Sequence, residues 1–266
     1  MTRLRAVWAQ GRSALNGWCA IGNPFVAEIM AAQGFDSLTI DMQHGALDYS
    51  DLLPMLQAMR ASGATLLARV PWLDPAHVMK ALDAGAEGVI CPMVNTPEDA
   101  ARLVSYLRYP PQGVRSFGPT RAVFALGADY AERANAEVLA FAMIETAEAL
   151  ANLDAIVATP GLDGIYVGPA DLSLSVSEGR LPFGMDREEP EMIGHLQKIA
   201  AACQARGIVA GLHCGTPDYA HRAIGWGFRM VTVGGDTRFL SSAAAAAVAG
   251  FRNLTGAAGG RSPHGY

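Results

Sequence analysis

Six ionisable or amide side chains follow short apolar runs of the sequence, where they could act together on a small anionic molecule. Carboxylates bind hard cations such as Mg²⁺ or Mn²⁺, or share a proton, and histidine moves protons near neutral pH. Arginine stabilises a developing negative charge. The set therefore predicts chemistry on a substrate that becomes anionic as it reacts. It consists of Asp41, Gln43, His44, Arg69, Glu145 and Asp171.

Glu145 and Asp171 form the most informative pair. Glu145 ends an almost wholly apolar run, where an unpaired carboxylate is costly. Asp171, taken by itself, can be interpreted as a helix cap. Adjacent strands lie ~4.8 Å apart, so carboxylates at neighbouring strand ends can reach one cation. Two carboxylates completed by water and substrate oxygens suit Mg²⁺ or Mn²⁺. A proton-sharing pair, as in glycosidases, and two unrelated surface acids are the alternatives.

Arg69 and His44 each have a structural and a functional interpretation. Arg69 either makes a salt bridge at the rim of the sheet or stabilises an anionic intermediate. His44 is either a hydrogen-bonded structural histidine, the commoner case for a lone histidine, or a proton carrier, and its position beside Asp41 brings the two interpretations close to even. We expect His213 and Cys214 to pack at the core or rim, because no ligands at metal-binding spacing accompany them.

Strand-like apolar runs alternate with helix-period segments along the whole chain. Apolar residues in the intervening segments recur at three- and four-residue steps, and many of these segments open on a cap or proline and close on glycine. Eight such units predict a (β/α)8 barrel, and an open doubly wound sheet is the alternative, although no G-x-G-x-x-G follows the first strand. The expected strands are 14–22, 35–42, 65–72, 86–94, 138–145, 162–168, 208–215 and 228–235.

The domain organisation follows from this alternation. We expect one barrel domain over residues 1–258, ending in an alanine-rich helix from Thr237, and a flexible glycine-rich tail over 259–266. Two connections, 110–130 and 173–190, exceed the ~2–6 residues usual between strand and helix. The second follows the sixth strand, at the end of a barrel where chemistry takes place, and is a candidate lid.

Composition excludes several classes of protein. The net charge of −5 and the absence of basic runs argue against nucleic acid as a partner. No apolar run approaches the ~20 residues that cross a bilayer, so we expect no membrane partner. The N-terminus lacks the pattern of a signal peptide, and four cysteines without C-x-x-C spacing predict free thiols. These features indicate a cytoplasmic protein.

Lysine is nearly absent from the chain. Of 20 basic residues only Lys80 and Lys198 are lysines, and both fall inside helix-period segments away from strand ends. A catalytic Schiff base needs a lysine at the reacting centre. The count therefore argues against Schiff-base chemistry.

Five motifs together resemble those of one known family. IDMQHG, LARVPW, GVICPMVNT, AMIET and VGPADLS are similar, in this order, to motifs of the HpcH/HpaI aldolases, over about residues 14 to 240. These are metal-dependent pyruvate aldolases of the 4-hydroxy-2-oxoheptanedioate type, with a barrel of the phosphoenolpyruvate/pyruvate superfamily. The resemblance implies reversible cleavage of a 4-hydroxy-2-oxo acid to pyruvate, or hydroxypyruvate, and an aldehyde. It also implies a homo-oligomer, typically a hexamer.

The resemblance implies a role for each matching residue. Mg²⁺ or Mn²⁺, with Co²⁺ or Zn²⁺ as further possibilities, is the implied cofactor. The implied metal ligands are Glu145 and Asp171, and the implied catalytic residues are His44, Arg69 and Asp83. The implied substrate contacts are Arg69, Gly168, Ala170 and Asp171. Asp41 and Gln43 are implied to bond metal-bound water.

Three positions qualify the resemblance. Gln43 stands where several members have Glu, and Met143 where some have a polar residue. Asp83 ends the helix after the third strand, which runs away from the catalytic mouth, so it reaches His44 only across a subunit interface. Two other functions stay open: a citramalyl- or malyl-thioester lyase, with Arg115 and Arg121 binding CoA phosphates, and a non-catalytic keto-acid-binding barrel.

Overall fold

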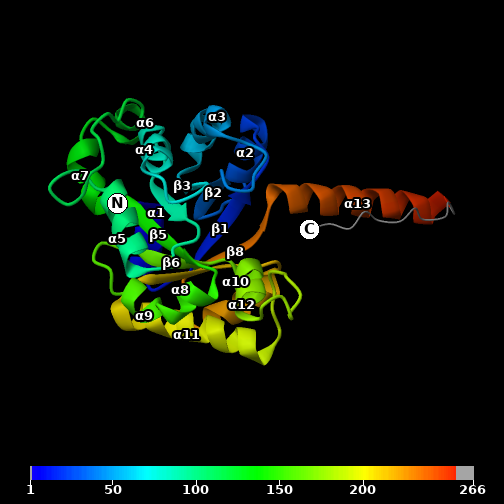
Figure 1. Ribbon diagram of the computed structural model, residues 1–266. Coiled ribbons are helices and arrows are strands. Elements are labelled where there is room, and N and C mark those ends of the chain that lie inside the picture. The colour runs from blue at the N-terminus through cyan, green and yellow to red at the C-terminus, as the bar shows by residue number, and fades with distance from the viewer. Residues whose placement is uncertain (1, 256–266) are drawn as a thin grey trace.

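Eight parallel strands close into a barrel with helices outside it, in a computed structural model that describes residues 2–255 (Figure 1). The strands pair in sequence order from β1 to β8, and β8 pairs with β1. This confirms the (β/α)8 prediction. The strands are β1 (Ala14–Cys19), β2 (Ser37–Asp41), β3 (Thr65–Arg69), β4 (Gly88–Cys91), β5 (Leu139–Ile144), β6 (Gly164–Val167), β7 (Val209–His213) and β8 (Met230–Gly235). The tail expected at 259–266 lies outside the described residues.

The helices begin where the sequence predicts caps. Asn23, Asp74, Thr96 and Thr216 each accept a hydrogen bond from a backbone N–H of the first turn, and a proline follows each of them. The helical elements are α1 (Arg3–Ala9), α2 (Pro24–Ala31), α3 (Tyr49–Met59), the 3₁₀ turn η1 (Arg60–Ser62), α4 (Pro75–Asp83), α5 (Pro97–Leu107), α6 (Ala122–Leu126), α7 (Tyr130–Glu137), α8 (Ala147–Ala151), α9 (Leu153–Ile156), α10 (Pro169–Val176), α11 (Pro190–Arg206), α12 (Pro217–Gly225) and α13 (Asp236–Thr255).

The apolar core has two parts. One lies between the barrel and its surrounding helices, and the other fills the barrel itself. The inner part includes Trp18, Phe141 and Tyr166, together with Leu4 of α1. Helix α1, which the sequence analysis did not predict, therefore closes the amino end of the barrel, leaving the carboxyl end for the site.

The two long connections lie at opposite ends of the barrel. The stretch 110–130 joins α5 to β5, so it is a helix-to-strand connection at the amino end, and it contains α6. The stretch after α10 lies at the carboxyl end, as predicted. Its Asp186 accepts hydrogen bonds from Gly215 N at 2.6 Å and Thr216 Oγ1 at 2.7 Å. This part of the candidate lid is therefore fastened to the loop that follows β7.

Helix α13 projects from the body of the barrel (Figure 1). Of its 20 residues only Asp236 is buried. The carboxylate of Asp236 accepts hydrogen bonds from the backbone N–H groups of Ala20 and Ile21, which fixes the start of the helix to the loop after β1. Farther along, Phe251 is 68% and Leu254 89% exposed. An isolated helix that exposes large apolar side chains is only marginally stable in water.

The structure bears on two expectations from composition, one about membrane-spanning helices and one about the cysteines. Within residues 2–255, no helix combines the length and apolarity needed to cross a membrane. All four cysteines are free and buried, as predicted.

Candidate active site

Strand ends bring most of the predicted residues to one mouth of the barrel. Asp41 and Arg69 are the last residues of β2 and β3 and are register partners. Glu145 follows β5 directly, and Asp171 lies in the first turn of α10, just after β6. Because the carboxyl ends of all eight strands point the same way, these four side chains share the end of the barrel opposite α1.

Asp41 and Arg69 form a bidentate ion pair. Arg69 Nε donates to Asp41 Oδ1 at 2.8 Å and Arg69 Nη2 to Oδ2 at 2.5 Å. Trp18 Nε1 donates to the same Oδ2 at 3.1 Å, and the Arg69 guanidinium lies 4.9 Å from the Trp18 ring centroid. Although burial opposes it, this pairing holds the pKa of Asp41 below its usual value. Arg69 is thus a fixed, oriented cation.

Glu145 is a buried acid with one oxygen engaged. Its side chain is 2% exposed, and Oε1 accepts a hydrogen bond from Met93 N at 2.7 Å. Met93 has a φ of 55°, which is rare outside glycine, so the chain bears backbone strain to aim this N–H. Burial, together with the negative charge of Asp171, raises the pKa of Glu145 to about 7. The carboxylate is therefore costly without a cation.

The second oxygen of Glu145 faces the chain that leads to Asp171. A Cβ added at Gly168 would lie 2.6 Å from Glu145 Oε2 and 3.1 Å from Met143 Cε, so only glycine leaves room there. Met143 lies in the barrel interior, which makes this side of the mouth apolar. Among the described residues no three His, Cys, Asp or Glu side chains form a metal-binding group. A cation here therefore has two carboxylates as its only acidic ligands, and two carboxylates completed by water and substrate oxygens fit Mg²⁺ or Mn²⁺.

Gln43 and His44 lie on the turn after β2. Their backbone N–H groups donate to Asp41 Oδ1 at 3.1 and 3.2 Å, so the acid also shapes this turn. The His44 residue is exposed at the mouth. Gln43 Oε1 is buried and has no hydrogen-bond partner, so it is an acceptor free for a water or a ligand hydroxyl. Both oxygens of Asp41 are already bonded within the protein, and its contact with metal-bound water remains a prediction.

Asp83 lies at the other end of the barrel. It ends α4, the helix that returns from the mouth after β3, and it accepts a hydrogen bond from Arg115 Nη2 at 2.7 Å. Arg115 is buried and also donates to Tyr130 Oη at 2.9 Å. Arg121 donates to the carbonyl of Ala84. Asp83 therefore does not meet His44 within one chain, and its action across an interface remains a prediction.

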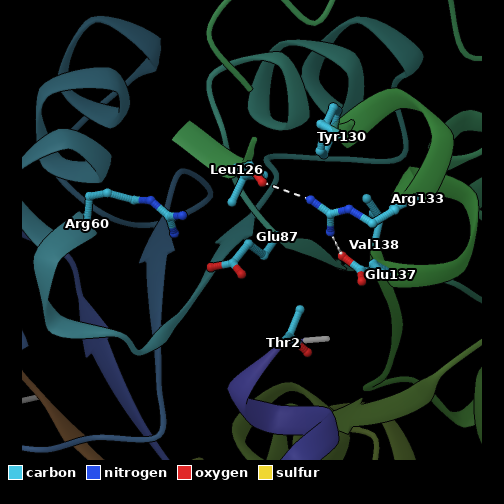
Figure 2. Close-up of a pocket in the computed structure, with 8 residues that line it drawn as sticks. All are labelled: Thr2, Arg60, Glu87, Leu126, Tyr130, Arg133, Glu137 and Val138. Carbon is cyan, nitrogen blue, oxygen red and sulfur yellow. Dashed lines mark hydrogen bonds and ion pairs between the residues drawn. The ribbon is translucent and has the colours of Figure 1, made fainter. Parts of the chain in front are cut away.

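The amino end of the barrel also holds a cavity of ≈170 Å³ (Figure 2). Arg133 lines it and donates to the Leu126 carbonyl at 2.8 Å and to Glu137. Glu87, which lies just before β4, also lines it, and its Oε2 accepts from Leu66 N at 3.1 Å. The cavity contains none of the predicted site residues. This face of a barrel serves stability, so we place the chemistry at the opposite mouth.

Two contributors to the mouth, Trp18 and Met93, were missed from the sequence, and a third, His213, was expected only to pack at the core or rim. Trp18 supports the Asp41–Arg69 pair, Met93 binds Glu145, and His213 contacts Trp18 with ring centroids 4.7 Å apart. Trp18 and His213 are polar or aromatic residues at strand ends, which is a signal the sequence does contain. Met93 acts through its backbone and left no such signal.

A closed parallel barrel whose carboxyl mouth gathers three acids, a fixed arginine and a histidine has the architecture of a (β/α)8 enzyme. The model of the HpcH/HpaI aldolase/citrate lyase family matches residues 15–243. The chain belongs to this family and is a carbon–carbon lyase.

Named relatives agree with this assignment over nearly the full chain. A hydroxypyruvate/pyruvate aldolase of Rhizorhabdus wittichii is 41% identical over 254 residues, which cover 96% of this chain and 100% of that protein. A 4-hydroxy-2-oxo-heptane-1,7-dioate aldolase of Salmonella dublin is 33% identical, over 94% of this chain and 95% of the relative. The crystal structure of a family member from Burkholderia cenocepacia J2315 gives a TM-score of 0.83 at 32% identity, over 91% of this chain and 95% of that one.

Proposed function

We propose that this protein is a divalent-cation-dependent aldolase that reversibly cleaves a 4-hydroxy-2-oxo acid to pyruvate, or hydroxypyruvate, and an aldehyde. One observation carries the proposal: Glu145, a buried acid with a raised pKa, lies beside Asp171 at the mouth that also holds Arg69. The names of the relatives from Rhizorhabdus wittichii and Salmonella dublin support the same reaction class.

Glu145 and Asp171 are the residues that would hold the cation. Oε1 of Glu145 is held by Met93 N, which leaves Oε2 for coordination. A bound divalent cation supplies Lewis-acid stabilisation of the enolate that forms when the carbon–carbon bond breaks. Mg²⁺ and Mn²⁺ suit the two-carboxylate set, and which of them is used, or Co²⁺ or Zn²⁺ instead, is part of the proposal.

Arg69 would place a second positive charge near the enolate oxygen. Its orientation is set before substrate arrives, because two of its nitrogens are bonded to Asp41 and its face lies over Trp18. A preorganised charge stabilises a developing oxyanion without the cost of reorganisation during the reaction. Gly168 and Ala170, at the start of α10, would contact the pyruvate carboxylate through their backbone.

His44, or a water that it holds, would take the proton from the 4-hydroxyl group in the cleavage direction and return it in synthesis. Its exposure at the mouth leaves the ring accessible to substrate. Asp83 of a neighbouring copy would orient this ring. In its own chain Asp83 is bonded to Arg115, and burial raises its pKa.

Lysine chemistry has no support at this mouth. Lys80 lies in α4, where its Nζ is 4.8 Å from the ring centroid of Tyr49, and Lys198 lies in α11. Both lie on outer helices, as the sequence predicts. The electron pair released by bond cleavage therefore has no Schiff base to enter.

The thioester-lyase alternative is less favoured. Arg115 and Arg121, which would bind CoA phosphates, lie at the amino end of the barrel and are engaged by Asp83 and Ala84. They form no basic groove at the mouth of their own barrel. Calorimetric titration with free CoA checks this point, because an aldolase for short acids should give no binding heat.

The exposed helix α13 supports the proposal that the protein is a homo-oligomer. Its large apolar side chains, including Phe251 and Leu254, are uncovered in the single chain. A second copy of the chain is the partner that a symmetric assembly would supply. The hexamer remains a prediction, as does the cytoplasmic location.

Exchange of pyruvate methyl protons in D₂O, followed by NMR, tests the proposed function without any knowledge of the aldehyde. We expect exchange with Mg²⁺, its loss with EDTA, and its recovery when the cation is restored. Glu145→Gln and Asp171→Asn should abolish it, whereas Glu148→Gln, which alters an exposed acid on α8, should not. Exchange that persists in metal-free protein contradicts the cation's role. Binding of pyruvate without exchange indicates a non-catalytic barrel.

A further inference from the structure

A chain of buried polar side chains crosses the barrel interior. Asn16 Oδ1 accepts hydrogen bonds from Ser37 Oγ at 2.8 Å and Thr39 Oγ1 at 3.1 Å. Its amide nitrogen, Nδ2, donates to Thr232 Oγ1 at 2.9 Å. These four side chains are fully buried. Because the amide oxygen takes both hydroxyl protons, the direction of the bond to Thr232 is fixed.

The same direction continues from Thr232 to the mouth. Thr232 Oγ1 accepts from Asn16 and lies 2.7 Å from Tyr166 Oη, where either hydroxyl can donate, and we assign Thr232 as the donor. The Tyr166 proton then has His213 Nδ1, at 3.2 Å, as its acceptor. An imidazole nitrogen that accepts a hydrogen bond carries no proton, so the ring proton of neutral His213 is on Nε2.

His213 stays neutral at physiological pH. Burial lowers its pKa to about 4, and the nearby positive charge of Arg69 acts in the same direction. Arg238 adds to this shift, and Asp41 opposes it but is outweighed by burial. The neutral ring therefore has one donor and one acceptor, and the acceptor is taken by Tyr166.

The donor nitrogen of His213 belongs to a ring at the carboxyl end of β7, the end of the barrel that holds the candidate site. His213 is the last residue of β7, and its ring packs against the edge of Trp18, which in turn supports Arg69. Nε2 has no hydrogen-bond partner in the described part of the chain, and it is not among the buried polar atoms that lack one. It is therefore open to solvent or to a ligand.

We propose that His213 donates an Nε2–H hydrogen bond to an oxygen on the aldehyde-derived part of the substrate, and that Tyr166 and Thr232 are positioning residues that fix its tautomer. This inference rests on the proposed function. The contacts proposed for pyruvate, namely the cation, Arg69 and the backbone at Gly168, already account for its keto and carboxylate oxygens. A further fixed donor at the mouth is left for the second half of the substrate. The preferred aldehydes would then carry a hydroxyl or carboxylate group.

Competition between two aldehydes tests the role of His213. The measured quantity is the ratio of kcat/KM for D-glyceraldehyde to kcat/KM for butanal, both added to pyruvate. One neutral hydrogen bond corresponds to about a tenfold change in this ratio. We expect His213→Leu to lower the ratio about tenfold and His213→Gln, which keeps an N–H donor, to restore part of it. His221→Leu alters an exposed histidine of α12 and should leave the ratio unchanged.

Tyr166→Phe tests the relay. Loss of the phenol hydroxyl frees the His213 tautomer, so the ratio should fall several-fold, but it should fall no further when His213→Leu is already present. Correlation of ring protons and nitrogens by NMR of ¹⁵N-histidine protein should show His213 with its proton on Nε2. Observation of the proton on Nδ1 overturns the relay.

The experiments distinguish a failure of the inference about His213 from a failure of the proposed function. A purely structural role for His213 would lower both kcat/KM values together and leave their ratio unchanged, which overturns the inference. Pyruvate methyl exchange in the wild-type protein reports the proposed function separately, because it requires no aldehyde. Normal exchange with an unaltered ratio in both His213 variants therefore refutes only the role of His213.

Discussion

Cation binding should depend steeply on pH because of Glu145. Burial raises the pKa of this acid from its ordinary 4.5 to about 7, so a proton competes with the cation near neutral pH. The apparent dissociation constant scales with 1 + 10^(pKa − pH), which gives about elevenfold weakening at pH 6 and only about 1.1-fold at pH 8. An ordinary carboxyl with a pKa of 4.5 would change it by about 3% at pH 6. The expected difference between pH 6 and pH 8 is therefore about tenfold.

Titration of the protein with Mn²⁺, followed by electron paramagnetic resonance of the free ion, measures this dependence. Calorimetry in two buffers of different ionisation enthalpy should show almost one proton released per cation at pH 6 and almost none at pH 8. Since histidines also titrate in this range, His44→Asn is the matched control and should keep the pH dependence. A dissociation constant that is the same at pH 6 and pH 8 refutes the assignment of Glu145 as a buried ligand.

The stability of the cation-free protein should fall as pH rises, whereas cation binding strengthens as pH rises. The folded-state pKa of Glu145 lies above its unfolded value, so the folded protein holds the proton more tightly. Stability should therefore fall as pH rises from about 4.5 through about 7, by ~3 kcal/mol from this group. Urea denaturation of wild type and Glu145→Gln across this range isolates the contribution. Parallel curves for the two proteins would contradict the raised pKa.

Three further outcomes are expected. Gly168→Ala should weaken Mn²⁺ binding at least about tenfold, because the new Cβ would lie 2.6 Å from Glu145 Oε2; unchanged affinity in the titration above would mean that the carboxylate can move aside. Asp41→Asn should lower the free energy of unfolding, measured in urea, by about 3 kcal/mol, because it leaves Arg69 without its buried partner. The same variant should lower kcat more than it changes KM. A loss of stability below about 0.5 kcal/mol would argue that the ion pair is solvated. Deletion of residues 242–266, which removes most of α13, should reduce the molar mass measured by light scattering, and an unchanged mass would place the subunit interface elsewhere.

The sequence by itself determined the barrel and most of the mouth. Each strand is a short apolar run, and many helices open on a capping side chain or a proline, so local signals sufficed for eight units in order. Asp41, Arg69 and Glu145 were found because a charged residue at the end of an apolar strand is conspicuous without any tertiary information. The lysine count likewise excluded one chemistry without any structure.

Only the tertiary structure decided how those residues are paired. The resemblance implied that Asp41 bonds metal-bound water, and folding in addition joins it to Arg69 and Trp18 from two other strands. The strained N–H of Met93 that binds Glu145 is a backbone feature and left no residue-type signal. Such contacts depend on register and closure of the barrel, which are long-range properties.

The hydrogen-bond relay to His213 likewise combines features that the sequence predicts with contacts that only the tertiary structure decides. Strand alternation places Asn16, Tyr166 and Thr232 on inward faces, but their bonds join β1, β6 and β8, which only barrel closure brings together. The sequence analysis expected His213 to pack at the core or rim, and its ring does pack against Trp18. The direction of a hydrogen-bond chain, and therefore the position of one proton, follows from the three-dimensional arrangement of donors and acceptors, which no local pattern encodes.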